Sequence, residues 1–138
     1  PLYAQHIDQM NLQTLLQLFR ADKNSCLVGT DAVRDGIDVP GQALRMILYD
    51  RVPWPRPDML FKARAKWIGK NELTDRLTRI KLRQAFGRLI RRADDKGIFV
   101  MLDSRLPTRL TSAFPSDVTI ERLPLADALF QVRDFLGR

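Results

Sequence analysis

The sequence predicts an α/β fold in which helices flank a parallel sheet. Three short apolar runs, each bounded by polar residues or glycine, are typical of buried parallel strands. These runs are Cys26 to Val28, Met46 to Tyr49 and Ile98 to Leu102. Helical patterns separate them, and alternation of this kind indicates a layered α/β architecture. A length of 138 residues, 45% of them hydrophobic, suits one domain over residues 1–138.

Four helices are expected where apolar residues recur with a near-helical period. They cover about Leu12 to Phe19, Met59 to Ile68, Leu73 to Ala93 and Leu125 to Leu136. In the long third pattern, the apolar residues before position 80 and those after it lie on opposite faces. This change of register predicts a kink or break near residue 80.

Composition restricts the class of partner. The 23 Lys and Arg residues exceed the 16 Asp and Glu residues, and the resulting charge of +7 favours a polyanion: nucleic acid, phosphate or an acidic membrane surface.

The single cysteine, Cys26, excludes an internal disulfide and argues against a zinc or iron-sulfur site in this chain. No apolar run approaches the roughly 20 residues that span a bilayer. We therefore expect a soluble protein without a membrane partner, in the reducing cytoplasm.

Loops that follow strands usually bind the ligand in such folds, and residues 29–41 form the first of these. Three glycines, Gly29, Gly36 and Gly41, allow backbone amides to approach a phosphate or sugar, and Thr30 and Asp38 add polar contacts. A glycine-rich turn by itself is a weak signal.

The second candidate lies in residues 84–91. On one helix, Gln84, Arg88 and Arg91 share a line that faces away from the apolar side. Two aligned guanidiniums beside Gly87 are suited to clamp a phosphoryl group, because each donates paired hydrogen bonds and keeps its charge. The alternative is a solvated basic face.

Weaker candidates each have a structural alternative. Trp54, in the proline-rich stretch 53–57, could stack on a DNA base or pack against the next helix. A basic group that either tracks a DNA backbone or forms a solvated face comprises Arg56, Lys62, Arg64 and Lys66. His6 is expected to be exposed and without a catalytic partner. Asp94 and Asp95 are expected to form a turn rather than a metal site.

Taken together, these stretches resemble the DinG/XPD group of superfamily 2 helicases. GTDAVRDGIDVPG (residues 29–41) resembles motif V of that group, and VPWPRPD (residues 52–58) resembles its proline-rich loop. QAFGRLIRRADDKGIFVMLDSR (residues 84–105) resembles motif VI and the strand after it. Order and spacing also agree, so the resemblance covers about residues 12 to 123.

The resemblance implies the second RecA-like domain of an ATP-dependent DNA helicase that acts in DNA repair. Such a domain closes over ATP held by a first RecA-like domain and moves along single-stranded DNA in the 5′ to 3′ direction. On this analogy Arg88 and Arg91 are arginine fingers for the γ-phosphate, and Gln84 orients the attacking water. Thr30 and Gly29 then contact a DNA phosphate.

The same analogy places Gly36 and Asp38 at the ribose of the nucleotide or at the motif VI arginines. Several parts of the enzyme are absent from the sequence: a GxxxxGK[ST] loop, an Asp-Glu-Ala-His box and a cysteine quartet. ATP, Mg²⁺ and any iron-sulfur cluster are thus assigned to the missing first domain, and the fragment alone is expected to be inactive. We also expect the family's domain to begin before Pro1, so that one or two strands preceding Cys26 are lacking.

Two other functions remain open at this point. A basic nucleic-acid-binding module without ATPase activity fits the charge but leaves the line of Gln84, Arg88 and Arg91 unexplained. A superfamily 2 RNA helicase or translocase would share the arginines of motif VI, although the VPWPRPD loop favours the DinG/XPD group.

Overall fold

A computed structural model describes residues 1–39 and 43–137 and confirms the mixed α/β character of the chain. The chain divides into two compact units. Unit 1 comprises Pro1–Met46 and Gly87–Gly97, and unit 2 comprises Ile47–Phe86 and Ile98–Arg138.

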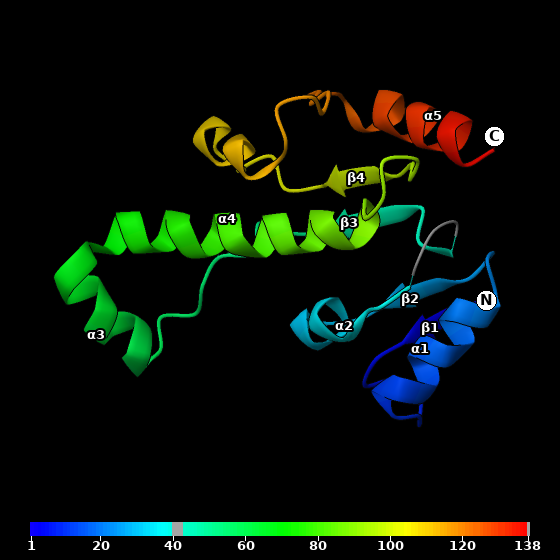
Figure 1. Cartoon of the computed structure of the whole chain (residues 1–138), viewed down its shortest axis with the longest axis horizontal. Helices are drawn as coiled ribbons and strands as arrows, with labels where there is room; N and C mark the ends of the chain where they lie inside the picture. The colour runs from blue at the N-terminus through cyan, green and yellow to red at the C-terminus, as the bar shows by residue number, and fades with distance from the viewer. Residues whose placement is uncertain (40–42, 138) are drawn as a thin grey trace. The chain divides into compact units, whose positions relative to one another are not determined.

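Unit 1 is built on a parallel strand pair covered by a helix (Figure 1). Strand β1 (Leu2–Ala4) pairs with β2 (Cys26–Val28), with Leu2 opposite Cys26, and helix α1 (Leu12–Ala21) packs on both strands. The helix begins at Asn11, whose side chain accepts a hydrogen bond from the Thr14 amide at 2.9 Å. Its buried face consists of Leu15, Leu16 and Phe19.

Strand β1 corrects the sequence analysis, which placed no strand before Cys26. The run Leu2 to Ala4 is too short to show an alternating pattern, so only its pairing with β2 identifies it as a strand. The glycine-rich stretch was also expected to be a turn, yet it contains the short helix α2 (Asp31–Gly36). Pro40 and Gly41 of that stretch lie outside the described residues.

Unit 2 contains a second sheet, in which β3 (Met46–Tyr49) pairs with β4 (Ile98–Met101). The rings of Tyr49 and Phe99 stack across this pair, with centroids 5.5 Å apart. The core beside the sheet includes Leu82 and Leu110, both fully buried, from α4 (Lys70–Leu89) and the 3-10 helix η2 (Thr108–Ala113). The predicted strands therefore exist, but the described strands form two separate pairs.

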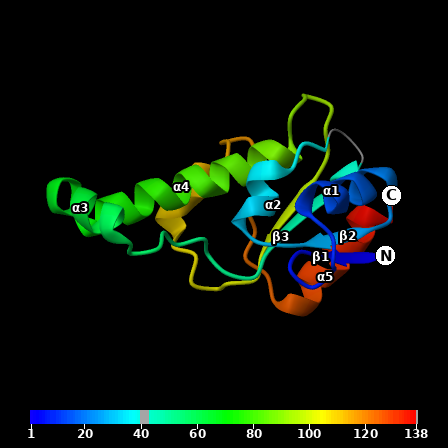
Figure 2. The ribbon, with the colours of Figure 1, turned by 90° about the horizontal axis from the view of Figure 1, so that it is seen from below.

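Helices α3 (Met59–Ile68) and α4 are separate rods that meet at an angle (Figures 1 and 2). Gly69 lies between them with φ +95°, a conformation that glycine adopts without strain. The break predicted near residue 80 is wrong, because α4 is continuous there. The apparent change of register arises because Ile80 is 48% exposed, while Thr78 is buried and donates its hydroxyl to the Thr74 carbonyl at 2.7 Å.

The last helix, α5 (Leu125–Leu136), confirms the predicted range. It has no buried residue, and Leu125, Leu129 and Phe130 are more than half exposed. Within the described part of the chain, no helix is both long and apolar enough to cross a membrane.

Candidate functional site

Helix α4 ends earlier than predicted, and the reason is a carboxylate. The sequence pattern extended the helix to Ala93, but α4 stops at Leu89. Asp95 accepts hydrogen bonds from the backbone amides of Arg91 and Arg92, both at 2.8 Å. These amides bind a side chain instead of helical carbonyls, so the chain leaves the helix and turns toward β4. The turn predicted at Asp94 and Asp95 is confirmed.

The shorter helix changes the predicted line of functional residues. Arg88 is on α4, whereas Arg91 lies beyond its end, so the prediction that Gln84, Arg88 and Arg91 share one helical line is wrong. Gln84 is exposed on the part of α4 that belongs to unit 2, and the two arginines belong to unit 1. The structure thus brings the arginines to one unit but does not assemble all three residues.

Arg91 connects the two sequence motifs inside unit 1. Its Nη1 donates a hydrogen bond to Oδ1 of Asp38, with which it forms an ion pair, and its Nη2 donates to the Ile37 carbonyl at 3.4 Å. The Arg91 side chain is only 23% exposed, but that of Asp38 is 71% exposed. The guanidinium is therefore held against residues 37–38, and the carboxylate faces solvent.

The charge around Asp38 is strongly positive. The hydrogen bond from Arg91 and the charge of Arg91 lower the pKa of Asp38, and the charges of Arg20 and Arg88 lower it further. Among the described residues Arg88 has no carboxylate partner of its own. Three arginines thus act on the carboxylate of Asp38, and Arg91 acts on Asp95 as well, which leaves the charges of Arg20 and Arg88 to attract an anionic ligand.

Thr30 is linked to a residue that the sequence analysis missed. Its amide and its hydroxyl both donate to Oε1 of Gln5, at 2.9 and 3.0 Å. Gln5 follows β1, and Thr30 follows β2, so both lie beyond the carboxyl ends of parallel strands. A lone glutamine near the start of the chain gives no sequence signal of this contact.

The two described glycines of the motif pack closely against their neighbours. A Cβ atom at Gly29 would lie 2.1 Å from Cγ2 of Val33, so any side chain there would displace the start of α2. At Gly36 a Cβ would meet Leu12 and Leu16 at ordinary contact distances of 3.5 and 3.6 Å. Glycine at position 29 is explained by this close approach, and the ligand roles of both glycines stay predictions.

Trp54 of unit 2 borders a hollow of about 250 Å³. The other lining residues are Asn71, Thr74 and Asp75 of α4 and Arg109 of η2. The Trp54 side chain remains 38% exposed. The indole is thus neither fully packed away nor fully free, and its neighbours come from α4 and η2.

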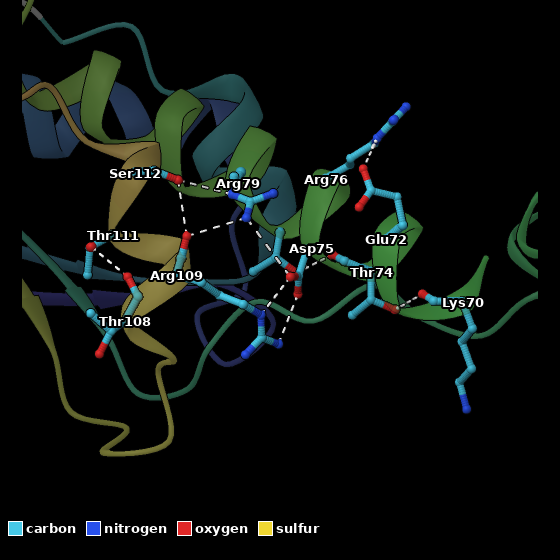
Figure 3. Close-up of polar contacts among 11 residues, drawn as sticks. Lys70, Glu72, Thr74, Asp75, Arg76, Arg79, Thr108, Arg109, Thr111 and Ser112 are labelled. Atoms are coloured by element: carbon cyan, nitrogen blue, oxygen red, sulfur yellow. Dashed lines mark hydrogen bonds and ion pairs between the residues drawn. The ribbon is translucent and has the colours of Figure 1, made fainter. Parts of the chain in front are cut away.

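A polar network that includes two residues of the hollow, Asp75 and Arg109, joins α4 to η2 (Figure 3). Asp75 accepts hydrogen bonds from Nε and Nη2 of Arg109, at 2.7 and 3.1 Å. Arg79 lies 4.0 Å from the same carboxylate and donates to Ser112 Oγ at 3.1 Å. The hydrogen bond from Arg109 lowers the pKa of Asp75, and the nearby arginine charges add to the effect. This network was not predicted from the sequence, since Asp75 and Arg109 are 34 residues apart.

For the minor candidates the structure gives the exposure of the side chains and leaves their roles as predictions. His6 is exposed, with φ of 70°. The four basic residues near the proline-rich loop are all exposed: Arg56, Lys62, Arg64 and Lys66. Over residues 1–39 and 43–137, no group of three or more His, Cys, Asp or Glu side chains is arranged to hold a metal ion.

Comparison with known proteins identifies similar sequences. The profile of the family described as "Helicase C-terminal domain" matches residues 1–120. The chain is 40% identical over 102 residues to the ATP-dependent helicase DinG of Mycobacterium tuberculosis, and 38% identical over 104 residues to the ATP-dependent DNA helicase YoaA of Escherichia coli. It is also 35% identical over 114 residues to the 3'-5' exonuclease DinG of Bacillus subtilis.

These similarities cover most of the chain but little of each relative. The alignments include 69% of the chain for the first two proteins and 78% for the third. They include only 15%, 16% and 12% of the respective relatives. The chain therefore corresponds to a small part of much longer proteins.

Proposed function

The chain belongs to the helicase C-terminal domain family, and from this premise we propose that it is the second motor domain of an ATP-dependent DNA helicase. In this proposal the chain contributes arginine fingers to ATP hydrolysis and part of the track for single-stranded DNA. Its relatives named as DNA helicases or ATP-dependent helicases support this reading. A RecA-like parallel sheet flanked by helices belongs to the same proposal, supported by the parallel β1–β2 pair and its covering helix α1.

The observation that carries the proposal is the contact between Arg91 and Asp38. This contact joins the stretch that resembles motif VI to the stretch that resembles motif V. Arg91 and Asp38 are 53 residues apart in sequence. A guanidinium bound to a carboxylate has the geometry and charge needed to bind the oxygens of a phosphoryl group instead. The guanidinium of Arg91 is therefore already oriented to bind two oxygens. The positive charge of Arg88 also acts on Asp38.

Hydrolysis would require Arg91 to exchange Asp38 for the γ-phosphate. In-line attack spreads negative charge over the transferred oxygens, and an arginine from across a cleft accelerates such reactions by about 10³ to 10⁵. Asp38, once released, is free to accept a hydrogen bond from a ribose hydroxyl. Turnover then depends on closure of this domain over bound ATP, because Arg91 reaches the phosphate only in the closed state.

The remaining assignments follow from the same premise. Gln84 orients the attacking water, and Gly36 lies with Asp38 near the nucleotide. Thr30 and Gly29 bind a DNA phosphate, for which the Thr30 amide and hydroxyl must leave Gln5. Trp54 stacks on a base. ATP and Mg²⁺ are bound mainly by a first RecA-like domain of the same protein, which is also where we propose any iron-sulfur cluster.

The test compares ATP turnover stimulated by single-stranded DNA in the full-length protein and its variants. Arg91→Ala and Arg88→Ala are expected to lower turnover by about a hundredfold or more while ATP and DNA affinities are retained. Arg92→Ala is the matched control, because the Arg92 side chain is exposed and Arg92 binds Asp95 only through its backbone amide. That variant should turn over normally.

Near-normal turnover in both test variants would contradict the arginine-finger assignment. The basic charge of +7 would then favour a nucleic-acid-binding module without ATP chemistry. A wild-type protein that binds single-stranded DNA but shows no stimulated ATPase would lead to the same conclusion.

A further inference from the structure

We propose that the hollow lined by Trp54, Asn71, Thr74, Asp75 and Arg109 binds one nucleotide of single-stranded DNA. The base stacks on the indole of Trp54, and the adjoining phosphate binds the guanidinium of Arg109. This inference rests on the proposed function, which already includes a DNA track, and it adds a defined subsite within unit 2. Neither Arg109 nor Asn71 drew attention in the sequence.

The backbone at Trp54 is restrained before any ligand arrives. Prolines at positions 53 and 55 flank it, and a residue that precedes proline is restricted to extended conformations. Its amide also donates to the Val52 carbonyl at 2.8 Å. A base that stacks on this indole orders little additional chain, so stacking retains most of its favourable free energy.

Arg109 is fixed on one side and open on the other. Its Nε and Nη2 bind the two oxygens of Asp75, while its Nη1 makes no hydrogen bond within the described residues. The Arg109 side chain is 59% exposed, whereas that of Asp75 is 14% exposed. The buried partner orients the guanidinium, and the exposed edge remains available to a phosphate oxygen.

The charge balance of the network favours an anion. Two guanidiniums, from Arg79 and Arg109, approach the single carboxylate of Asp75. The lowered pKa of Asp75 keeps this carboxylate ionised at neutral pH, so Arg109 stays oriented. One positive charge is left unmatched at the edge of the hollow, where a phosphate would lie.

Asn71 supplies the means to bind the edge of a base. It is exposed at the rim, and its amide has no hydrogen-bond partner among residues 1–39 and 43–137. The hydroxyl of neighbouring Thr74 is already donated to the Lys70 carbonyl at 2.7 Å. An aromatic face, a side-chain amide and a guanidinium thus line one hollow, and these are the groups that bind the face of a base, its edge and its phosphate.

The first experiment measures the affinity of the full-length protein for an oligo-dT strand. Trp54→Ala is expected to weaken binding about 5- to 150-fold, the range for loss of one stacked base. Trp54→Phe keeps an aromatic face and should recover most of this loss. Trp67→Ala is the matched control, since Trp67 of α3 is 92% exposed and outside the hollow.

The second experiment measures how this affinity depends on salt. Arg109→Gln should reduce the slope of log K against log salt by about 0.7, the value for one phosphate contact on a single strand. Trp54→Ala should leave the slope unchanged. Arg105→Gln is the control, because Arg105 forms a similar pair with Asp103 away from the hollow.

A third measurement locates the base directly. An oligo-dT strand that carries 5-iododeoxyuridine should crosslink to Trp54 upon irradiation, and mass spectrometry should find the modified base on this residue. No crosslink at Trp54, together with unchanged affinity of Trp54→Ala, would overturn the proposal. Equal loss of salt dependence in Arg105→Gln and Arg109→Gln would also overturn it, since the contact would then be diffuse.

These results separate the subsite from the helicase function. The control variants Trp67→Ala and Arg105→Gln should keep normal DNA-stimulated ATP turnover, whereas the Trp54→Ala and Arg109→Gln variants should need more DNA for half-maximal stimulation. If wild type shows DNA-stimulated ATPase and these variants bind DNA normally, the subsite alone is wrong, and an acidic protein segment becomes the better ligand for Arg109. If wild type neither binds single-stranded DNA nor hydrolyses ATP, the proposed function itself fails.

Discussion

Units 1 and 2 each contain an ion pair between an arginine and an aspartate. In unit 1 the aspartate is the more exposed partner, and in unit 2 the arginine is the more exposed partner. In unit 1 the Arg91 side chain is 23% exposed and that of Asp38 is 71% exposed. In unit 2 the Arg109 side chain is 59% exposed and that of Asp75 is 14% exposed. The arginine of the pair is therefore mostly shielded from solvent in unit 1 and exposed to solvent in unit 2.

The difference indicates two ways to use an arginine. A covered guanidinium must leave its carboxylate before it binds a phosphate, which suits a catalytic group that acts only after a conformational change. An exposed guanidinium oriented by a covered carboxylate can bind at once, which suits a DNA contact made at every step. Exposure, more than residue type, distinguishes the two proposed roles.

Lysine substitutions sharpen this comparison and should give the largest effects. Arg91→Lys is expected to lower DNA-stimulated ATP turnover about tenfold or more, because lysine keeps the charge but lacks the planar fork that binds two oxygens. Arg109→Lys should keep the salt dependence of DNA binding, since that slope counts charges. Turnover assays and salt titrations of the full-length protein test both. Normal turnover in Arg91→Lys would remove the need for a fork in unit 1.

Two glycines in unit 1 test how tightly the segment that carries Arg91 is packed. A Cβ at Gly97 would lie 2.5 Å from Cδ1 and Cγ of Leu89, so Gly97→Ala should destabilise unit 1 by about 1–3 kcal/mol. A Cβ at Gly87 meets nothing within 4 Å inside α4, so Gly87→Ala should stabilise the protein by about 0.5–1 kcal/mol. Thermal unfolding and amide exchange over residues 87–97 measure both. Equal effects of the same sign would show that the packing at Gly97 is looser than described.

Alanine substitutions should reverse the order of stability between the two pairs. In unit 2, Arg109→Ala leaves a mostly covered carboxylate with only Arg79 nearby, and it should lower the Tm by a few degrees more than Asp75→Ala. In unit 1, Arg91→Ala leaves a carboxylate that water already reaches, and it should lower the Tm less than Asp38→Ala. Differential scanning calorimetry gives the four values. The same order in both units would contradict the comparison.

Lowering the pH should weaken the two ion pairs, Arg91–Asp38 and Arg109–Asp75. The effect on Tm should be smallest near neutral pH. The pKa values of Asp38, Asp75, Asp95 and Asp103 are all lowered, each chiefly by a hydrogen bond from an arginine. A lowered folded-state pKa means that this stability is present above the unfolded value of about 4 and is lost as the pH falls below it. The Tm should therefore be nearly constant from pH 7 to 5 and fall below about pH 4.

Asp103 should contribute most to this acid sensitivity, because its pKa is lowered furthest. Arg105 donates to it from both the side chain and the backbone, and the Val52 amide donates as well. Asp103→Asn is thus expected to flatten the fall of Tm with pH more than Asp38→Asn does. An unchanged slope in Asp103→Asn would show that this carboxylate does not control the acid response.

Much of the fold was visible in the sequence, because continuous apolar runs and helical periods depend on local burial. The strands at Cys26 and Ile98 and the helix that begins at Met59 were predicted nearly to the residue. Strand β1 was missed, since three residues carry no measurable period. The end of α4 was also missed, because it depends on a side-chain hydrogen bond from Asp95 and not on propensity.

The candidate site was predicted in its residue types and only partly in its geometry. Arg91 and Asp38 were both singled out, and the structure brings them into contact. Their exposed fractions were not predictable, because these depend on which neighbouring segments cover each side chain. Gln84 shares α4 with Arg88, whereas Arg91 lies beyond the end of this helix, and the role of Gln84 is still a prediction.

The sequence by itself determined the helicase C-terminal family, the basic charge and the residues suited to bind phosphoryl groups, because each follows from residue identity and spacing along the chain. Only the tertiary structure decided that the Arg91 side chain is held against residues 37–38 and that Asp75 orients the exposed guanidinium of Arg109. It also decided that Trp54 and Asn71 border the same hollow. The physical reason is that exposure and hydrogen-bond choice are set by residues distant in sequence. Asp75 and Arg109 meet across 34 residues, and no local pattern encodes that contact.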